Sequence, residues 1–415
     1  MAAKFAGSGA LVLAPTGLGH LAAIGGCQWA VEQAKIEPPL IMPKILYLVT
    51  EDWFFVSHFL PMAQAARECG LEVAVATRVR AEGERLKAEG FSVIAIESQR
   101  GSFNPFRSLR DFFQTLRVVR QKRADIVHCI ALRPVVIGGI AAKLTGTGAL
   151  VLAPTGLGYL WIERGTAVLV ARKIVSVIVG SWLRGPRTRF LFENRDDPQE
   201  FGLDPDGADI TIVGGAGVDP AKFPRSEEPA APPLKVAVVS RMIRPKGIVE
   251  AVEAVRRARS AGALVELHLF GDPDPDNPRS IPEATLERWS AEQGITWHGR
   301  VADVAQVWRQ HHVAMLLSYR EGLPRSLVEA AAMGRPIVAT DVAGCREVVR
   351  DGQEGILVPL GDIDAAARAL TTLAADPDLR YRLGAAANAR FHERFTADAV
   401  RQKVRNLYLS LAPPP

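Results

Sequence analysis

The sequence predicts an α/β protein with two doubly wound, parallel-sheet domains that face each other across a cleft. From residue 42 onward, short β-branched runs alternate with amphipathic helical patterns, which is typical of parallel sheets covered on both faces. The alternation stops at Pro224–Pro233, which has four prolines, two glutamates and little to pack, and then starts again. A composition of 48% hydrophobic and 23% charged residues over 415 positions excludes a disordered chain, a coiled coil and a collagen-like fibre.

The first 41 residues are predicted to lie outside this plan. Ala10–Gly19 is identical to Ala149–Gly158, and the match continues at a constant offset of 139 over about 21 residues. This match is too short for a solenoid repeat, so we interpret the segment as an appendage that duplicates part of residues 140–160. The predicted parts are the appendage (1–41), an N-terminal Rossmann-like domain (42–223), a linker (224–233) and a C-terminal Rossmann-like domain (234–415) that includes two C-terminal helices in Pro377–Leu411. The position of these helices at the end of the sequence does not fix which domain they pack on.

Thirteen short apolar runs are predicted as strands. The N-terminal domain has Ile45–Val49, Val73–Ala76, Val93–Ile96, Ile126–Cys129, Ala149–Leu152, Phe190–Phe192 and Ile210–Val213. The C-terminal domain has Val236–Val239, Leu264–Phe270, Ile295–Trp297, Val313–Leu317, Ile337–Ala339 and Ile356–Val358. The helices predicted between them include Leu60–Cys69, Leu109–Gln121, Ile248–Arg259 and Leu327–Met333. Ligands of such sheets bind beyond the carboxyl ends of the strands, so residues that follow strands are the candidates for a site.

Positive charge is concentrated in one part of the chain. Residues 98–195 carry 16 Lys and Arg against four Asp and Glu, a net charge of +12 in a chain whose total is +5. This asymmetry indicates an anionic membrane surface or a phosphorylated acceptor as a partner, and the alternative is a solvated basic face. Thr166–Arg189 is too polar to span a bilayer and has the composition of an interfacial segment. The alternative for that stretch is that Val168–Val179 is a buried core helix.

Several familiar sites are excluded by the sequence. The four cysteines lie far apart, which predicts reduced thiols in a cytosolic protein and no metal site. No GxGxxG opens a helix after a strand, which weighs against a dinucleotide-dependent oxidoreductase, and no Walker lysine loop is present. The acid-rich stretch Gly271–Asn277 lacks a twelve-residue calcium-loop pattern and is interpreted as a turn-rich loop.

The stretch from Ser318 to Asp341 combines a strand end, a loop and a helix start. Glu321 and Gly322 lie in the loop, and Pro324 suits the first turn of the following helix. The free backbone N–H groups of Arg325 and Ser326 would then form an anion site suited to a diphosphate. Glu329 lies just over one turn further on and would face the same cleft. The alternative is an ordinary helix start with solvated glutamates.

A second candidate group follows the strand Val236–Val239. Arg241 and Lys246 lie in the loop that opens the next helix, and Gly247 allows close approach. Two cations at the carboxyl end of a strand suit a pyrophosphate, where they would stabilise charge on a leaving diphosphate. The alternative is a pair of surface cations.

The N-terminal domain offers a third candidate group. His128 is predicted at a cleft-facing strand end, and Arg133 follows it. Asp52, Trp53 and His58 follow the first strand, with Trp53 in a predicted loop, and they would hold an acceptor. Core packing is the alternative for the histidine and the aromatic residues.

The chain from Met42 to about Leu411 resembles a GT-B fold glycosyltransferase of family 4, the retaining class that uses nucleotide sugars. The resemblance rests on Arg241, Lys246-Gly247, Glu321-Gly322-Leu323-Pro324, Glu329, Ala332-Met333-Gly334-Arg335-Pro336 and Asp351-Gly352…Gly355. A narrower resemblance to bacterial enzymes of capsule, O-antigen and lipid-linked oligosaccharide synthesis rests on Asp52-Trp53-Phe54-Phe55, Thr155-Gly156-Leu157-Gly158-Tyr159, Phe192-Glu193-Asn194 and Gly344-Cys345-Arg346-Glu347.

The resemblance implies a role for each matching residue. Glu329 would bind the donor ribose, Glu321 would contact the transferred sugar, and Arg241 with Lys246 would hold the diphosphate. The amides from Leu323 to Ser326, which include those of Arg325, would hold sugar and phosphate, and the loop with Arg300 and Val301 would line the nucleobase. Many members carry a Gly-Gly loop after the first strand, where this chain has Glu51-Asp52-Trp53-Phe54.

The implied function is transfer of a sugar from a nucleotide-sugar donor, expected to be UDP-linked, to a polyprenyl-diphosphate-linked or growing glycan acceptor in bacterial surface polysaccharide synthesis. The catalytic candidates are Glu321, Arg241, Lys246 and His128. We expect no metal and no cofactor beyond the donor, no nucleic-acid partner, and a cytoplasmic protein at the inner face of the plasma membrane. The alternatives are a nucleotide-sugar epimerase or hydrolase of the same architecture and a non-catalytic glycan- or nucleotide-binding protein.

Overall fold

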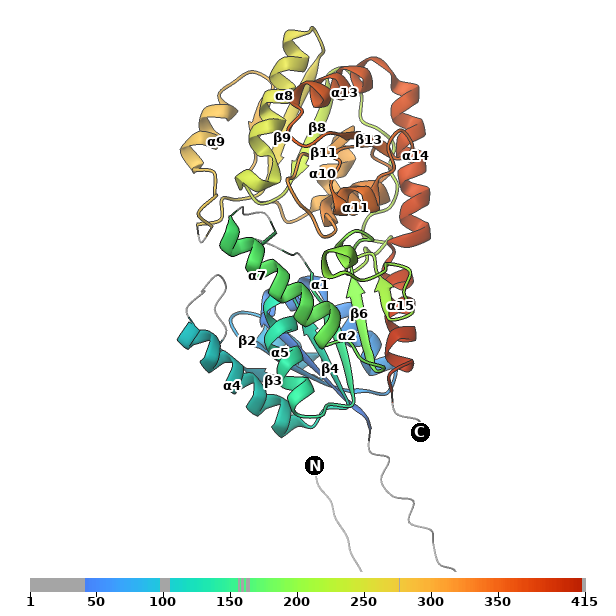
Figure 1. The fold of residues 1–415 in the computed structure, drawn as a ribbon. Coiled ribbons are helices and arrows are strands. Elements are labelled where there is room, and N and C mark those ends of the chain that lie inside the picture. Colours follow the sequence, from blue (N-terminus) through green and yellow to red (C-terminus); the bar gives the residue numbers. More distant parts are fainter. Residues whose placement is uncertain are drawn as a thin grey trace, which may run out of the picture. The chain divides into compact units, whose positions relative to one another are not determined.

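The computed structural model describes residues 42–97, 105–155, 157, 160–161, 165–275 and 277–412. Within these residues the strands form two parallel sheets, one with seven strands in the order β3-β2-β1-β4-β5-β6-β7 and one with six in the order β10-β9-β8-β11-β12-β13 (Figure 1). The predicted appendage, residues 1–41, lies outside the described residues. The prediction of two doubly wound parallel-sheet domains is confirmed, because each sheet carries helices on both faces.

All predicted strands of the N-terminal domain are present, with ends that move by up to two residues. They are β1 (Lys44–Glu51), β2 (Glu72–Arg78), β3 (Ser92–Ala95), β4 (Ile126–Ile130), β5 (Ala149–Ala153), β6 (Thr188–Phe192) and β7 (Ile210–Ile212). The central strands read as continuous apolar runs because both of their faces are buried. Ile45 and Tyr47 of β1 face one core, while Leu46 and Leu48 face the other.

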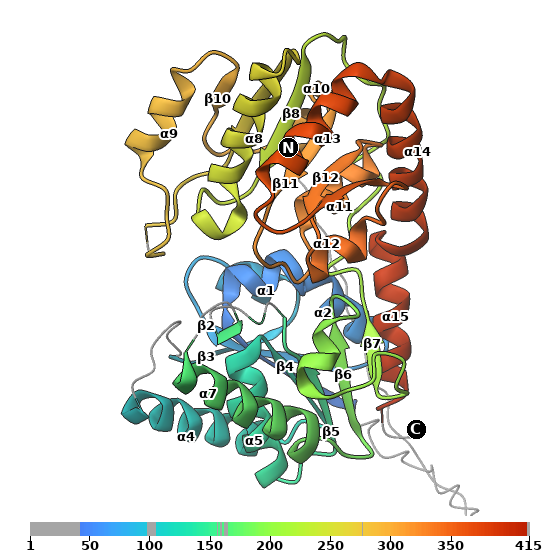
Figure 2. The same cartoon turned by 45° about the horizontal axis from the view of Figure 1, so that its top comes forward.

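Helices cover the two faces of this first sheet in two groups. One core contains α1 (Asp52–His58), α2 (Leu60–Glu68) and α3 (Gly83–Ala88). The other contains α4 (Pro105–Lys122), α5 (Leu132–Leu144) and the end of α7 (Thr166–Val177), which continues as a π-helical turn, η1 (Ile178–Trp182). Figure 2 shows α4, α5 and α7 together on this face. The predicted loop at Trp53 is instead α1, which buries Phe55 and leaves Trp53 exposed.

The strands predicted for the C-terminal domain are also all present. They are β8 (Leu234–Val239), β9 (Val265–Phe270), β10 (Ile295–Trp297), β11 (Val313–Leu316), β12 (Ile337–Thr340) and β13 (Gly355–Val358). The helices around them are α8 (Ile248–Ser260), α9 (Glu283–Ser290), α10 (Val304–Gln310), α11 (Arg325–Ala332), α12 (Ala343–Val348), α13 (Ile363–Ala375) and α14 (Pro377–Arg394). Short 3-10 turns, η2 (Asp197–Phe201) and η3 (Arg244–Lys246), lie in the connections of the first and second domain, respectively.

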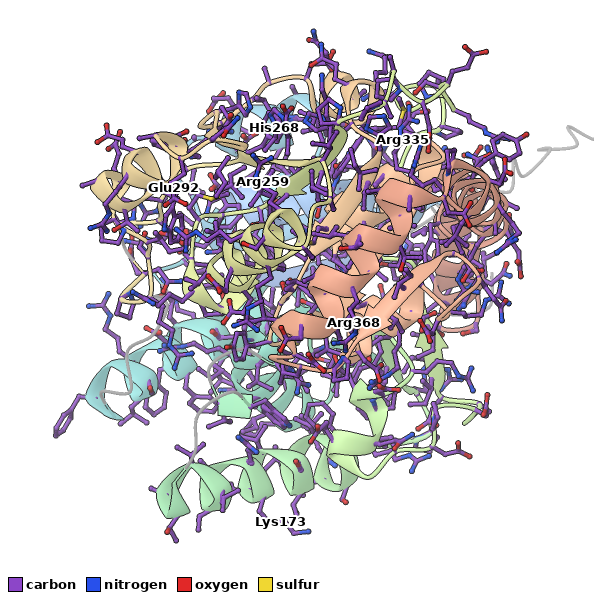
Figure 3. All side chains as sticks on the ribbon, turned by 90° about the horizontal axis from the view of Figure 1, so that it is seen from above. Lys173, Arg259, His268, Glu292, Arg335 and Arg368 are labelled. Atoms are coloured by element: carbon purple, nitrogen blue, oxygen red, sulfur yellow. The ribbon has the colours of Figure 1, made fainter. Side chains whose placement is uncertain are left out.

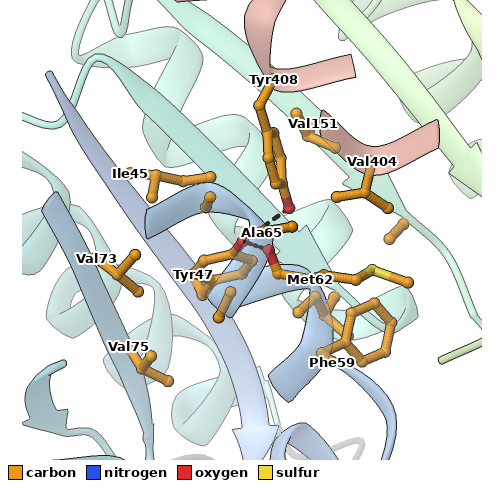
Figure 4. Packing of buried hydrophobic residues seen from close by; sticks show 14 of the residues in the cluster. Ile45, Tyr47, Phe59, Met62, Ala65, Val73, Val75, Val151, Val404 and Tyr408 are labelled. Carbon is orange, nitrogen blue, oxygen red and sulfur yellow. Dashed lines mark hydrogen bonds between the residues drawn. The ribbon is translucent and has the colours of Figure 1, made fainter. Parts of the chain in front are cut away.

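The last helix, α15 (Ala397–Leu409), corrects the predicted domain boundary. Its buried face, with Val400, Val404 and Tyr408, belongs to a core of the first sheet, although the chain enters it from the second domain. The Tyr408 hydroxyl lies 2.7 Å from the Tyr47 hydroxyl of β1 (Figure 4). Assigning all of residues 234–415 to the C-terminal domain is therefore wrong for α15. An amphipathic pattern shows that a helix has a buried face, and it does not show which sheet covers that face.

The linker Pro224–Pro233 packs more closely than its composition predicts. The buried Arg335 guanidinium donates hydrogen bonds to the Ser226 hydroxyl and to the Glu227 carbonyl oxygen, the latter at a distance of 2.8 Å. Glu228 forms an ion pair with Arg380 at 3.2 Å. These polar contacts hold in place a segment whose composition offers few apolar side chains for packing. Its partners are polar side chains of the second domain, which no local pattern in the linker reveals.

Candidate functional site

An open cleft of about 1360 Å³ lies at the carboxyl ends of both sheets. Its walls are the segments that follow β1, β2 and β5 of the first domain and β8, β9, β10 and β11 of the second. Among the described residues that line it, seven are cationic (Arg78, Arg80, Arg241, Lys246, Arg279, Arg300 and Arg320) and four are carboxylates (Glu51, Asp272, Asp274 and Glu321). The excess of positive charge makes the cleft suitable for an anionic ligand.

The structure joins two residues that the sequence placed in separate candidate groups. The Lys246 ammonium donates to both carboxylate oxygens of Glu321 at 2.6 and 2.8 Å. The Ser318 hydroxyl donates to the same carboxylate at 2.5 Å, and Glu321 is only 8% exposed. A cation and a carboxylate thus meet at the wall of the cleft, where a charged ligand can exchange contacts with both.

Gly247 explains how Lys246 reaches Glu321. Its φ is +70°, and a Cβ there would lie 2.0 Å from the carbonyl oxygen of Leu317 at the end of β11. Only glycine combines this left-handed conformation with such a close approach. The turn that carries Lys246 therefore packs directly against the residue that follows β11, from which the chain continues into the Glu321 loop.

Arg241 lines the same cleft and has a different partner. Its guanidinium donates to the Asp274 carboxylate at 2.6 Å, and its side chain is 56% exposed. Asp274 lies in the loop after β9 that the sequence analysis interpreted as a turn-rich loop. The position of this loop could have identified it as part of the site, because it follows the carboxyl end of β9, the strand next to β8.

The predicted donor-binding residues fall into two sets. Gly322, Arg300 and Val301 line the cleft. The other set lies at the start of α11 and outside that lining: Leu323, which packs against the core of the second sheet, Pro324, which precedes the helix, and Arg325, Ser326 and Glu329.

Glu329 is covered by its own helix in this structure. Its carboxylate accepts a hydrogen bond from the Arg325 guanidinium at 2.8 Å. Burial raises the pKa of Glu329 above its ordinary value, against the opposing effect of Arg325. Arg325 also donates to the Ser57 carbonyl oxygen of α1 at 2.9 Å, so it links the helix start to the first domain.

Asp52 acts on the wall of the cleft through the backbone. It is fully buried, and its carboxylate accepts from the amides of Trp53, Arg80 and Glu82 at 2.7, 2.7 and 2.9 Å. It therefore holds the loop after β2, which carries Arg80. Sequence reasoning missed Arg78 and Arg80, although both follow the buried part of a strand beside β1.

Three other acceptor-side candidates occupy different positions. Trp53 lines the cleft with an exposed ring. His58 ends α1, where its imidazole lies 2.6 Å from the Ser57 hydroxyl. Arg133 lies outside the cleft, beside a separate small cavity, and donates to Asp111 at 2.7 Å.

The predicted position of His128 is wrong. The residue lies inside β4 and is fully buried, with its Nδ1 atom 3.0 Å from the Tyr408 hydroxyl of α15. Desolvation lowers the pKa of His128 to about 3, so the imidazole is neutral. It packs between the sheet and α15 and does not face the cleft.

Glu193 is a functional candidate to which the sequence analysis gave no role. It follows β6 directly and is partly buried. Burial, together with the nearby carboxylates of Asp197 and Glu321, raises the pKa of Glu193 to about 8. The surroundings of Glu193 therefore favour the neutral form of its carboxyl group. Among the described residues, no group of three or more His, Cys, Asp or Glu side chains is arranged to hold a metal ion.

Comparisons with known proteins show the family of this chain. Residues 44–177 match a family model described as glycosyl transferase 4-like, and residues 233–376 match one described as glycosyl transferases group 1. The N,N'-diacetylbacillosaminyl-diphospho-undecaprenol alpha-1,3-N-acetylgalactosaminyltransferase of Campylobacter jejuni is 24% identical over 85% of this chain and 95% of its own length. A capsular polysaccharide biosynthesis glycosyltransferase of Staphylococcus aureus, CapM, is 22% identical over 88% and 96%.

Solved structures show the same fold. The crystal structure of Anabaena HepE in complex with UDP-glucose superposes with a TM-score of 0.69 over 88% of this chain and 99% of that chain, at 18% identity. The glycosyltransferase WaaG, which is involved in lipopolysaccharide biosynthesis, gives a TM-score of 0.64 over 88% and 99%, at 14% identity.

Proposed function

Since the chain belongs to the group 1, family 4-like glycosyltransferases and has the GT-B fold, we propose that it transfers a sugar from a UDP-sugar to a lipid-linked or growing glycan acceptor of a bacterial surface polysaccharide. The observation that carries the proposal is the Lys246–Glu321 pair in the wall of a cation-rich cleft. The volume exceeds the roughly 300–1,000 Å³ of an ordinary ligand pocket, which leaves room for two substrates. HepE, a structural neighbour, was crystallised with UDP-glucose.

The proposed chemistry retains the anomeric configuration. The bond between the sugar C1 and the diphosphate oxygen breaks while the acceptor oxygen forms a bond to C1 on the same face. The leaving diphosphate takes the acceptor proton, and Lys246 with Arg241 stabilises its negative charge. Glu321 positions the transferred sugar and makes no covalent bond to it. These two cations fulfil the charge-neutralising role of a metal ion, so we expect none to be required.

The first-domain wall is the proposed acceptor side. It presents the exposed Trp53 ring and the guanidinium groups of Arg78 and Arg80, with Glu51 between the two cations at 3.7 and 3.4 Å. The relative from C. jejuni has a diphospho-undecaprenol substrate in its name. An acceptor of that class carries a diphosphate that the arginines can bind and a lipid that remains in a membrane.

A face of the first domain fits such a membrane. None of the residues of α7 is buried, and Leu169, Val170, Ile174 and Val177 are each between 49% and 58% exposed. Phe106, Leu109 and Phe113 of α4, which covers the same side of the sheet, are between 55% and 82% exposed. Cations lie among them, and Lys173 points away from the ribbon in Figure 3. The alternative of a buried core helix over Val168–Val179 holds only for the end of that range, where Val179 is fully buried in a core of the first sheet.

The anionic lipid surface supplies the driving force in this proposal. Each Lys or Arg near such a surface gains about 1 kcal/mol, and the apolar side chains add burial in the interface. Within the described residues, no helix is long and apolar enough to cross a bilayer. Flotation with phosphatidylglycerol-containing vesicles at low and high salt tests the attachment. The variant Leu169→Glu with Ile174→Glu should lose it, while Leu264→Glu, an exposed apolar position in the second domain, should not. Equal flotation of all three proteins would refute it.

The function is tested by incubating the protein with a panel of UDP-sugars and undecaprenyl-diphosphate-linked saccharides. We expect release of UDP, a product heavier by one sugar residue, an anomeric centre like that of the donor, and the same rate in EDTA. Conversion of the donor without acceptor would instead identify an epimerase or hydrolase. Binding without turnover of any donor would indicate a non-catalytic protein.

A further inference from the structure

A short segment of the first domain holds the residues on both sides of Glu321. The Asn194 side-chain amide donates to the Gly322 carbonyl oxygen at 2.9 Å. The Asp197 carboxylate accepts from the Arg320 guanidinium at 2.7 Å. Asn194 and Asp197 follow β6 of the first sheet, whereas Glu321 follows β11 of the second. The first domain therefore contacts the loop that contains Glu321 on both sides of that residue.

The fastening segment is itself internally braced. The Asn194 amide also donates to Asp197 at 2.9 Å, and its carbonyl oxygen accepts from the backbone amides of Asp196 and Asp197 at 3.1 and 2.9 Å. Asn194 is 0% and Asp197 is 3% exposed. Buried polar groups whose hydrogen bonds are satisfied in only one arrangement are expensive to move. This bracing gives the two side chains a fixed position from which to hold the loop.

The loop has little freedom on its other side. A Cβ on Gly344 would lie 2.5 Å from the Gly322 carbonyl oxygen, so α12 packs closely against the peptide that Asn194 binds. The Glu321 carboxylate is meanwhile held by Lys246 and Ser318 of its own domain. The second domain thus orients the Glu321 side chain, and the first domain binds the Gly322 carbonyl oxygen and the Arg320 side chain next to it.

We propose that Asn194 and Asp197 are positioning residues, which set the Glu321 loop in register with the first domain so that the donor sugar meets the acceptor. The inference rests on the proposed glycosyl transfer. A displacement of about 1 Å in a reacting group can cost on the order of 10²-fold in rate, so a group that only places a loop can still determine turnover. Donor and acceptor are bound by different domains in this proposal, so such a register must be set somewhere.

The same segment contains a matched control. Asp196 forms an ion pair with Arg346 at 2.5 Å, and both side chains are more than 40% exposed. This pair also joins the two domains, and it does not touch the residues next to Glu321. Exposed pairs contribute about 0–1 kcal/mol. Removing the Asp196–Arg346 ion pair therefore weakens the contact between the domains and leaves the hydrogen bonds of Asn194 and Asp197 to the Glu321 loop in place.

The experiment compares Asn194→Ala and Asp197→Asn with Asp196→Asn in the full chain, using UDP-sugar and acceptor. We expect kcat to fall by about 10–100-fold in the first two, with the Kd of UDP within about threefold of the wild-type value, because the interaction acts on the transition state. Asp196→Asn should keep wild-type kcat. Because Asn194→Ala removes several buried hydrogen bonds, Asp197→Asn decides the question if that variant does not fold.

Three results would overturn the inference: kcat of Asp197→Asn within about threefold of wild type, an equal fall in Asp196→Asn, or a loss that lies entirely in UDP affinity. Failure of the proposed function is distinct, because wild-type protein would then transfer no sugar from any donor tested, and the inference would fall with it.

Discussion

Replacing Lys246 by Met should damage both turnover and stability, and replacing Arg241 by Met should damage turnover alone. Each loses a cation that stabilises the leaving diphosphate, which predicts about 10²–10³-fold lower kcat. The stabilities differ because the partners differ. The Lys246 side chain is 22% exposed and its partner, the Glu321 carboxylate, is 8% exposed. The Arg241 side chain, which pairs with Asp274, is 56% exposed.

The magnitude of the stability loss follows from burial. Removing one partner of a buried ion pair costs about 3–5 kcal/mol, and the partial exposure of Lys246 reduces this to roughly 2–3 kcal/mol. The more exposed Arg241 pair is worth about 0–1 kcal/mol. Adding Glu321→Gln to Lys246→Met should restore most of the stability, because the amide needs no counter-charge, while kcat remains low.

The assay pairs initial rates of UDP release with urea-induced unfolding. The reasoning about Lys246 is refuted if Lys246→Met keeps kcat within about twofold of wild type. It is also refuted if the unfolding midpoints of Lys246→Met and Arg241→Met fall equally, since the difference in exposure would then not determine the loss of stability. Failure of the double variant to regain stability would mean that the lost energy is not the unpaired Glu321 charge.

Three further predictions concern other parts of the chain. Glu329→Ala should weaken UDP binding by roughly ten- to a hundredfold, since a hydrogen bond to a charged group is worth about 1.5–3 kcal/mol; unchanged affinity in calorimetry would mean that Glu329 keeps its contact with Arg325 when donor is bound. A chain that starts at Met42 should fold and turn over as the full chain does, and an insoluble or inactive product would contradict the appendage interpretation. Glu193 has a pKa of about 8 in the folded protein, above its ordinary value of 4.5, so the folded state holds a proton that the unfolded state releases. The unfolding free energy of wild type should therefore fall between about pH 5 and 8 relative to that of Glu193→Gln, and parallel pH profiles would contradict this.

Residues of the site that are close in the sequence could be predicted to lie together, whereas pairs from different strands could not. Glu321, Gly322 and Glu329 belong to one strand–loop–helix unit, so their proximity follows from local structure. The strands could also be predicted from the sequence, because a strand that is buried on both faces is an apolar run wherever it packs. The pairing of Lys246 with Glu321 needed the order of strands in the sheet, since β8 and β11 are neighbours in space and distant in sequence.

Other features depended on contacts that no local pattern carries. His128 follows apolar residues toward a strand end, as a cleft residue would, and its burial comes from α15, which crosses from the other domain. The linker looked unpacked because its partners, Arg335 and Arg380, are cations far along the chain. Asn194 was visible only as part of a resemblance, because its function lies in a bond to a carbonyl oxygen of the opposite domain.

Asp52 and Asn194 have the same structural role, because each holds a loop of the cleft in place. Each is a fully buried polar residue just beyond a strand of the first sheet, and each binds backbone groups of a loop that lines the cleft. Asp52 holds the loop of Arg80, and Asn194 holds that of Glu321. A buried side chain bound to backbone loses its hydrogen bonds when the loop moves, so each loop is confined to one position. Substitutions at these sites should therefore change catalysis through the loops, with Asp52 affecting acceptor use and Asn194 affecting the donor sugar.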